Sequence, residues 1–346
     1  MRMEMLSIKT EICCIFHKFH NTGSYFNLMD PKRLILILCL CFAELLLKGQ
    51  DYRWWNELHN WDGISSWKEY ITYSSAYMGP NAIPVPEINS ADFTDLTLVE
   101  MGLQQHLSEG DRTINFISDV FIPVVPQRTG IRIHYIPCEF YETDTYTRDL
   151  RAARDYDPTG SSFGDFYVST YIQVIKDHRK MPDLLLTINL KTASGTNLGN
   201  ARHTDAPGYY FDASFGRTFQ TGKAIITSWR PFFMGGFYSY QTNRRDYLQN
   251  DALLFGMGVI VSTPVLQIEN RLGGYMGFFG NGDQPVVYRM KFLSRRESIV
   301  NYKLEFQSGL HDFPYSSIAI SFIMRFEKLK FFWGRQGSGN GNDLKE

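Results

Sequence analysis

The sequence predicts an all-β protein: a transmembrane, antiparallel, up-and-down β-barrel of about twelve strands, preceded by an irregular N-terminal segment rich in aromatic residues. Between residues 96 and 326, short stretches of alternating apolar and polar residues succeed one another, joined alternately by long polar loops and tight turns. In the stretch Val286–Phe292, apolar residues recur at every second position, and Arg289 and Lys291 fall between them. Because successive side chains of a strand point to opposite faces, such a strand has one apolar face and one charged face.

The composition also favours a barrel over a helical membrane protein. Aromatic residues make up 15% of the 346 residues, with 26 Phe and 20 Tyr, as expected of a barrel with aromatic girdles at both membrane interfaces. The mean hydropathy of −0.24 is too polar for a bundle of transmembrane helices, whereas only alternate residues of a barrel strand meet lipid. The net charge of −1 gives no indication of a nucleic-acid partner.

Residues 1–49 are expected to form a leader and a signal peptide. Two basic residues precede the apolar run Leu34–Ala43, which has the composition of a secretory signal and is too short for a comfortable spanning helix. Cleavage is expected after Gly49, and the residues before Met29 favour Met29 as the true start. Cys138 is then the only cysteine of the mature chain, which excludes an internal disulfide.

Residues 50–92 differ in composition from the alternating stretches and form the predicted N-terminal segment. Four of the six tryptophans lie here, and the prolines between Met78 and Pro86 exclude regular structure. Two interpretations stay open: an aromatic periplasmic segment packed on the rim of the barrel, or a plug that enters its lumen.

Residues 93–327 carry the alternating stretches and form the predicted barrel. The twelve predicted strands are Thr97–Gln105, Thr113–Val124, Ile131–Tyr141, Asp165–Ile175, Leu184–Thr192, Tyr209–Phe219, Ala224–Tyr240, Ala252–Ser262, Val265–Tyr275, Val286–Ser294, Val300–Ser308 and Ser317–Glu327. Pro231, inside the seventh of these, requires a bulge or a position without a ladder hydrogen bond.

The connections sort into long and short sets. Residues 142–163, 194–207 and 242–250 are long polar loops that come after odd-numbered strands, and the turns after even-numbered strands are short. Long outer loops and short periplasmic turns are typical of outer-membrane barrels, so both ends of the mature chain are expected in the periplasm. A soluble β-sandwich or lipocalin-like barrel also alternates, but strands of ~9–11 residues fit a membrane better.

The last predicted strand carries a resemblance. Its residues Ser317–Phe326 resemble the closing strand of bacterial outer-membrane barrels, which implies outer-membrane lipids and the barrel-assembly machinery as partners. Residues 328–346, at the C-terminal side of this strand, are flexible by composition.

A second resemblance covers six residues. Leu190–Gly195 resembles the segment Leu-Lys-x-Pro-Thr-Gly of the porin-like family named for the MetA pathway of phenol degradation, with Ala193 in the place of the proline. The resemblance implies a porin-like protein but does not identify the solute.

If the bulky faces of the strands meet lipid, polar residues of the other faces line the lumen. The candidate pore-lining residues are Glu100, Arg132, His134, Glu269, Arg271, Arg289, Lys291, Lys303, Glu305 and Arg325. On the last four strands, two acids of this set stand against five bases. These groups either pair across strands and fill a narrow interior, or line a polar channel whose excess of bases attracts anions.

The predicted function is that of a porin-like channel for small polar or anionic solutes. The alternative is a sealed barrel that acts as an outer-membrane lipid hydrolase or as a scaffold for surface partners. The pairs considered for a hydrolase are His106 with Ser108, His203 with Asp205, and His311 with Asp312. His311 and Asp312 are adjacent in the sequence, so their side chains are expected to point apart in an extended segment. No metal or cofactor is expected, and the oligomeric state stays open.

Overall fold

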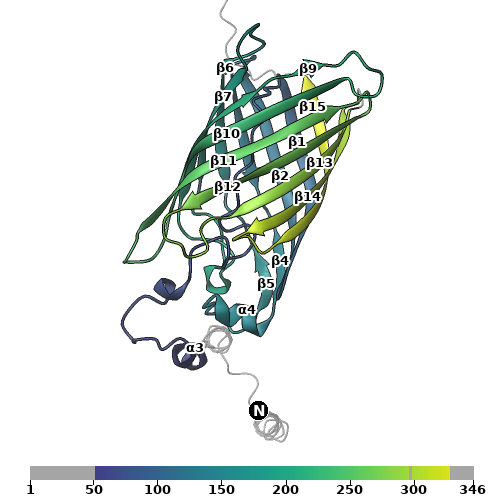
Figure 1. The fold of residues 1–346 in the computed structure, drawn as a ribbon. Helices are drawn as coiled ribbons and strands as arrows, with labels where there is room; N and C mark the ends of the chain where they lie inside the picture. The colour runs from purple at the N-terminus through teal and green to yellow at the C-terminus, as the bar shows by residue number, and fades with distance from the viewer. Residues whose placement is uncertain (1–50, 296–297, 328–346) are drawn as a thin grey trace, which may run out of the picture. The chain divides into compact units, whose positions relative to one another are not determined.

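The computed structural model describes residues 51–295 and 298–327, so the predicted leader, signal peptide and C-terminal tail lie outside the described residues. Twelve antiparallel strands close into a β-barrel, and three further strands extend the same sheet (Figure 1). The prediction of an all-β barrel of about twelve strands is confirmed.

The barrel strands succeed one another around the wall almost in chain order. They are β1 (Leu96–Ser108), β2 (Asp111–Val125), β3 (Thr129–Tyr135), β6 (Tyr167–Ile175), β7 (Asp183–Lys191), β8 (Gly208–Gly216), β10 (Ser228–Gln241), β11 (Gln249–Ser262), β12 (Leu266–Gly277), β13 (Val286–Ser294), β14 (Val300–His311) and β15 (Ser316–Glu327). The other described elements are α3 (Arg53–Leu58), η1 (Trp67–Tyr70), β4 (Glu139–Thr143), α4 (Thr145–Leu150), β5 (Thr159–Ser162), η2 (Leu198–Asn200) and β9 (Phe219–Gln220).

The wall closes where β1 pairs with both β2 and β15. Leu103 on β1 lies opposite Phe116 on one side and Ile320 on the other. All three side chains point outward, with exposed fractions of 55%, 40% and 57%. The seam between the first and last strands is therefore continuous, and these strands present no unpaired edge.

The exterior of this barrel is apolar, unlike the surface of a soluble protein, and the interior holds most buried charges together with an apolar cluster around residues 71–88. Outward positions carry exposed Leu, Ile, Phe and Met side chains, whereas most buried charged side chains belong to inward positions. The closed barrel and its apolar exterior are those of a bacterial outer-membrane protein. Among the described residues, no helix is both long and apolar enough to cross a membrane.

The third predicted strand, Ile131–Tyr141, is wrong in its extent. The structure divides it into β3, which ends at Tyr135, and β4, which begins at Glu139. Pro137 lies in the break, where its ring removes a backbone donor. β4 then pairs with the first half of β2 and with β5, so the predicted loop 142–163 contains α4 and β5.

The seventh predicted strand, Ala224–Tyr240, begins too early. β10 starts at Ser228, and residues 217–227, with β9, form a longer connection than expected at that end of the barrel. Pro231 lies in β10 without a register shift, one residue beyond the pairing of β10 with β8. Its missing donor therefore costs no hydrogen bond to β8.

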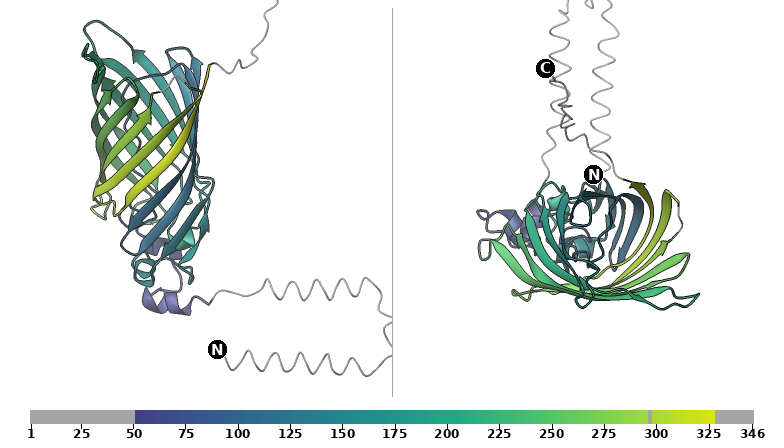
Figure 2. Two further views of the ribbon diagram at one scale, coloured as in Figure 1. Left: turned by 90° about the vertical axis from the view of Figure 1, so that its right-hand side faces the viewer. Right: turned by 90° about the horizontal axis from the view of Figure 1, so that it is seen from above.

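The two ends of the barrel differ in their connections. We call the end formed by residues 136–166, 192–207, 242–248 and 278–285 the long-loop end, and the opposite end the short-turn end. α4, β4 and β5 lie at the long-loop end, and β15 finishes at the short-turn end (Figures 1 and 2).

The N-terminal segment crosses the lumen from one end to the other. At the long-loop end, Trp55 donates from its indole nitrogen to the carbonyl of Ala152 at 3.1 Å. Residues 71–93 are largely buried inside the barrel, and the carbonyl of Phe93 accepts from Lys176 at the short-turn end at 2.7 Å. Trp55 and Glu327 thus lie at opposite ends of the barrel. The two ends of the mature chain, both expected in the periplasm, lie outside the described residues.

The apolar exterior leads to a test of the membrane barrel. Replacing Leu103 with Arg places a charge near the middle of β1 on the outward face, and we expect the free energy of unfolding in lipid vesicles to fall by about 2–4 kcal/mol. Denaturant titration measures this change. Leu150→Arg is the control, because Leu150 is equally exposed but lies on α4. Equal effects of the two substitutions would contradict a lipid-facing β1.

Candidate functional site: the charged lumen

Two cavities lie in the lumen beside residues 71–93, which we call the crossing segment. One of about 170 Å³ lies toward the long-loop end, and one of about 260 Å³ lies toward the short-turn end. Six charged residues line both cavities, and we call them the charged ring: Glu87, Glu100, Asp119, Arg132, Lys291 and Lys303. Five of these residues belong to the barrel wall, and Glu87 belongs to the segment.

The inward faces of β12, β13 and β14 carry charges of alternating sign. The strand register places Glu269 opposite Lys291, and Lys291 opposite Glu305. Lys303 lies 2.5 Å from Glu100 and 3.3 Å from Glu305. Opposite charges on facing positions stabilise a sheet, so this ladder results from the inward alternation of the sequence.

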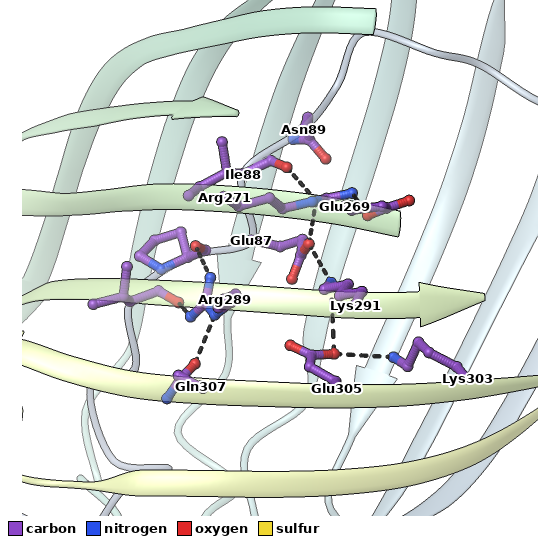
Figure 3. Close-up of polar contacts among 12 residues, drawn as sticks. Glu87, Ile88, Asn89, Glu269, Arg271, Arg289, Lys291, Lys303, Glu305 and Gln307 are labelled. Carbon is purple, nitrogen blue, oxygen red and sulfur yellow. Dashed lines mark hydrogen bonds and ion pairs between the residues drawn. The ribbon is translucent and has the colours of Figure 1, made fainter. Parts of the chain in front are cut away.

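Glu87 of the crossing segment completes this ladder from the opposite side. Its carboxylate contacts the guanidinium of Arg271 and lies 2.6 Å from Nζ of Lys291 (Figure 3). Arg271 also contacts Glu269 on its own strand. Sequence reasoning missed Glu87, because an irregular, proline-containing stretch offers no periodicity from which to place a side chain.

Arg289 is buried, with 6% of its surface exposed, and its guanidinium donates to three uncharged oxygens. It bonds the carbonyls of Val85 and Pro86 at 2.6 and 2.9 Å and the side-chain oxygen of Gln307 at 2.6 Å (Figure 3). Its positive charge is thus balanced by dipoles of the segment, which makes it the strongest candidate for an anion contact.

On the opposite wall, Asp119 holds the two bases of β3. Arg132 lies 2.8 Å and His134 3.2 Å from its carboxylate. Sequence analysis placed both bases in the lumen but omitted Asp119. Its inward position was readable from β2, where it shares a face with Thr113 and Asn115.

Nine of the ten candidate pore-lining residues lie along these walls, and Arg325 lies apart. It belongs to the short-turn end of β15 and lines a separate cavity with Gln267 and Arg295. The alternation of the sequence correctly predicts the inward face for Arg325, but its position along β15 lies beyond the charged ring.

A second buried charge cluster lies at the long-loop end. Arg202, fully buried, is 2.8 Å from Glu139 and 2.7 Å from Asp111, and Arg151 is 2.6 Å from the same Asp111. The cluster fixes two long loops to β2 and β4. Because each charge has a partner, the desolvation cost of burying the charges is offset within the cluster.

Two of the three histidine pairs considered for a hydrolase are wrong. His106 lies 2.6 Å from Ser317 on the neighbouring β15, not on Ser108, because β1 and β15 pair side by side. His203 lies 3.6 Å from Glu139. Asp205 points away, toward Lys68.

The expectation that His311 and Asp312 point apart is also wrong. Their side chains lie 3.5 Å apart, because Asp312 has a φ of 45° and the chain turns there instead of continuing extended. In the described part of the chain, no group of His, Cys, Asp and Glu side chains is arranged to hold a metal ion.

A set of polar contacts ties the long loops to the residues just before the crossing segment. Lys68 pairs with Asp205, and Glu69 lies 2.8 Å from Arg245 and accepts from Arg244 through its carbonyl. Burial alone would raise the pKa of Asp205, but hydrogen bonds from Lys68 and Asn243 outweigh it and hold the pKa below its usual value.

Protein-family models and curated proteins gave no match to the chain. Similar solved structures include the COG4313 outer membrane channel from Pseudomonas putida F1, with 11% identity and a TM-score of 0.48 over 72% of this chain and 98% of that one. The KdgM porin has 7% identity and a TM-score of 0.38, over 66% and 99%. The Acinetobacter baumannii outer membrane protein Omp33 has 10% identity and a TM-score of 0.34, over 67% and 99%. The likeness is one of barrel architecture, and the resemblance of Leu190–Gly195 to the MetA-pathway family stays a prediction.

The Lys68–Asp205 contact leads to a pH prediction. Because the pKa of Asp205 is lowered in the folded protein, its stabilising contribution is present above the usual value of 3.8 and is lost as pH falls through the lowered pKa. At neutral pH, we expect Asp205→Asn to speed amide exchange of residues 66–71 by about 2- to 5-fold, as for a half-exposed ion pair of ~0.5–1 kcal/mol.

Hydrogen exchange with mass spectrometry measures this effect, and the difference between wild type and variant should vanish at strongly acidic pH. Asp62→Asn is the control, because the Asp62 side chain bonds only within residues 62–65 among the described contacts. A difference that persists unchanged at low pH would contradict the role given to Asp205.

Proposed function

We propose that this barrel is a porin-like channel for small polar or anionic solutes. The observation that carries the proposal is a pair of cavities in the lumen that share the six charged residues of the ring as lining. A barrel that only fills its interior has no need of such space, since buried charges gain from close packing.

Positive and negative charges in this lumen are close to balanced, with a local excess of positive charge at Arg289. The charged ring contains three acids and three bases, so the excess of bases expected from the last four strands is reduced by Glu87, Glu100 and Asp119. All the described hydrogen bonds of Arg289 go to uncharged oxygens, so no carboxylate hydrogen-bonds to its guanidinium. This positive charge supports a preference for anions.

The segment 71–93 supports the second interpretation of the N-terminal region, that of a plug. The cavities of about 170 and 260 Å³ are smaller than the ~300–1,000 Å³ typical of sites for drug-sized ligands. Solutes larger than a few heavy atoms therefore require the segment to shift.

The position of the one close His–Ser pair among the described residues, His106 with Ser317, argues against a lipid hydrolase. His106 and Ser317 are 2% and 8% exposed and face the lumen, whereas lipid meets the outward face. A hydrolase needs its nucleophile within reach of the substrate.

Ion selectivity tests the proposed channel. We expect the double substitution Arg289→Glu and Lys291→Glu to lower the permeability ratio of chloride to potassium about threefold or more, because lumen charge sets the local concentration of counter-ions. The reversal potential in a salt gradient across a planar bilayer measures the ratio.

The matched control reverses two charges outside the lumen. Arg179→Glu with Lys180→Glu makes the same change of net charge on an exposed turn at the short-turn end. An unchanged reversal potential in the Arg289 and Lys291 variant, or an equal shift in the control, would reject this wall as pore lining.

A further inference from the structure

The crossing segment is held in the lumen in an unusual way. In the described part of the chain, residues 83–93 make no backbone–backbone hydrogen bond. Their carbonyls accept instead from long side chains of the barrel wall, chiefly arginines. Arg289 bonds Val85 and Pro86, and Arg271 bonds Ile88.

Arg230 repeats this arrangement nearer the short-turn end. It donates to the carbonyls of Ser90 and Ala91 at 2.9 and 3.0 Å, while pairing with Asp183 at 2.8 Å. The segment is therefore bound as a separate peptide is bound in a groove, and each of its contacts is one that a solute oxygen is able to replace.

The centre of this arrangement is a carboxylate between cations. Glu87 contacts Arg271 and Lys291, and the neighbouring carbonyls cover Arg289 (Figure 3). Charge-assisted hydrogen bonds of this kind are the preferred means of holding a carboxylate.

Apolar packing fixes the register of this carboxylate. Ile88, fully buried, lies over Gly256 of β11 and Gly273 of β12, which face each other in the sheet. The three nearest heavy atoms to a Cβ built at Gly256 all belong to Ile88, at 2.7, 2.9 and 3.3 Å. The two glycines thus form a socket for Ile88, and the adjacent Glu87 is aimed at the cations.

We propose that residues 85–88 are a built-in ligand, and that Arg271, Arg289 and Lys291 form a binding site for the carboxylate of a small solute, which Glu87 occupies until the segment shifts. This inference rests on the proposed channel and names the class of solute, a small carboxylate. Glu87 competes with the solute because a tethered group acts at an effective concentration on the order of mM. The apparent affinity for the solute is reduced by the fraction of molecules in which the site is free.

Two variants free the site by independent means. Glu87→Gln removes the competing charge and keeps the shape of the side chain. Gly256→Val pushes Ile88 out of its socket and leaves every charge in place, and Ile88→Ala added to it restores the room. Asp92→Asn is the control, since it removes an exposed carboxylate from the same segment.

The measurement is binding of ¹³C-acetate to the full folded protein in detergent micelles, monitored by NMR line broadening. We expect Glu87→Gln and Gly256→Val each to bind acetate roughly tenfold or more tighter than wild type. Asp92→Asn and the double variant Ile88→Ala, Gly256→Val should behave as wild type, and acetamide, the neutral isostere, should not bind. Wild-type affinity in both Glu87→Gln and Gly256→Val, or equal binding of acetamide, would overturn the inference.

Conductance of the same proteins in a planar bilayer separates this inference from the proposed function. Tighter acetate binding together with reduced chloride current on acetate addition supports both. Tighter binding in proteins that carry no current supports the carboxylate site and overturns the channel. Current that responds to Arg289 and Lys291 reversal, with unchanged acetate binding, keeps the channel and overturns the built-in ligand.

Discussion

Backbone groups that cross the interior of a barrel need hydrogen-bond partners, and this requirement shapes the lumen of this protein. Residues 83–93 cannot join the sheet, because the wall already closes through the pairing of β1 with β15. Their carbonyls are satisfied by Arg230, Arg271 and Arg289, side chains long enough to reach the axis of the barrel. The arginines of the inner wall are therefore structural, and in the proposed channel the same groups become free for solute contacts when the segment shifts.

The same contacts tie charge balance to the position of the segment. With Glu87 in place, the charged ring holds as many acids as bases. Any shift of the segment removes an acid and three carbonyl dipoles from the vicinity of Arg271 and Arg289, so the lumen becomes more positive as it becomes wider. In the proposed channel, selectivity by size and selectivity by charge are therefore coupled.

Much of the fold was predictable, because lipid on one side and polar space on the other impose a period of two on every spanning strand. The inward placement of Arg289, Lys291 and Lys303 results from that period alone. The division of β3 from β4 was not predictable in extent, since alternation continues on both sides of Pro137. Glu87 was beyond reach for a different reason: its role depends on contacts with residues 184 and 204 positions away in the sequence, made by a stretch without periodicity.

The crossing of the lumen by residues 71–93 has a consequence for assembly. Trp55 and Trp67 lie at the long-loop end, yet the chain beyond them starts β1 at the short-turn end, beside the last strand. The chain therefore passes through the lumen of a barrel that is closed by its own first and last strands. Bulky aromatic side chains pass an open barrel far more easily than a closed one, so we expect residues 71–93 to enter the lumen before β1 pairs with β15.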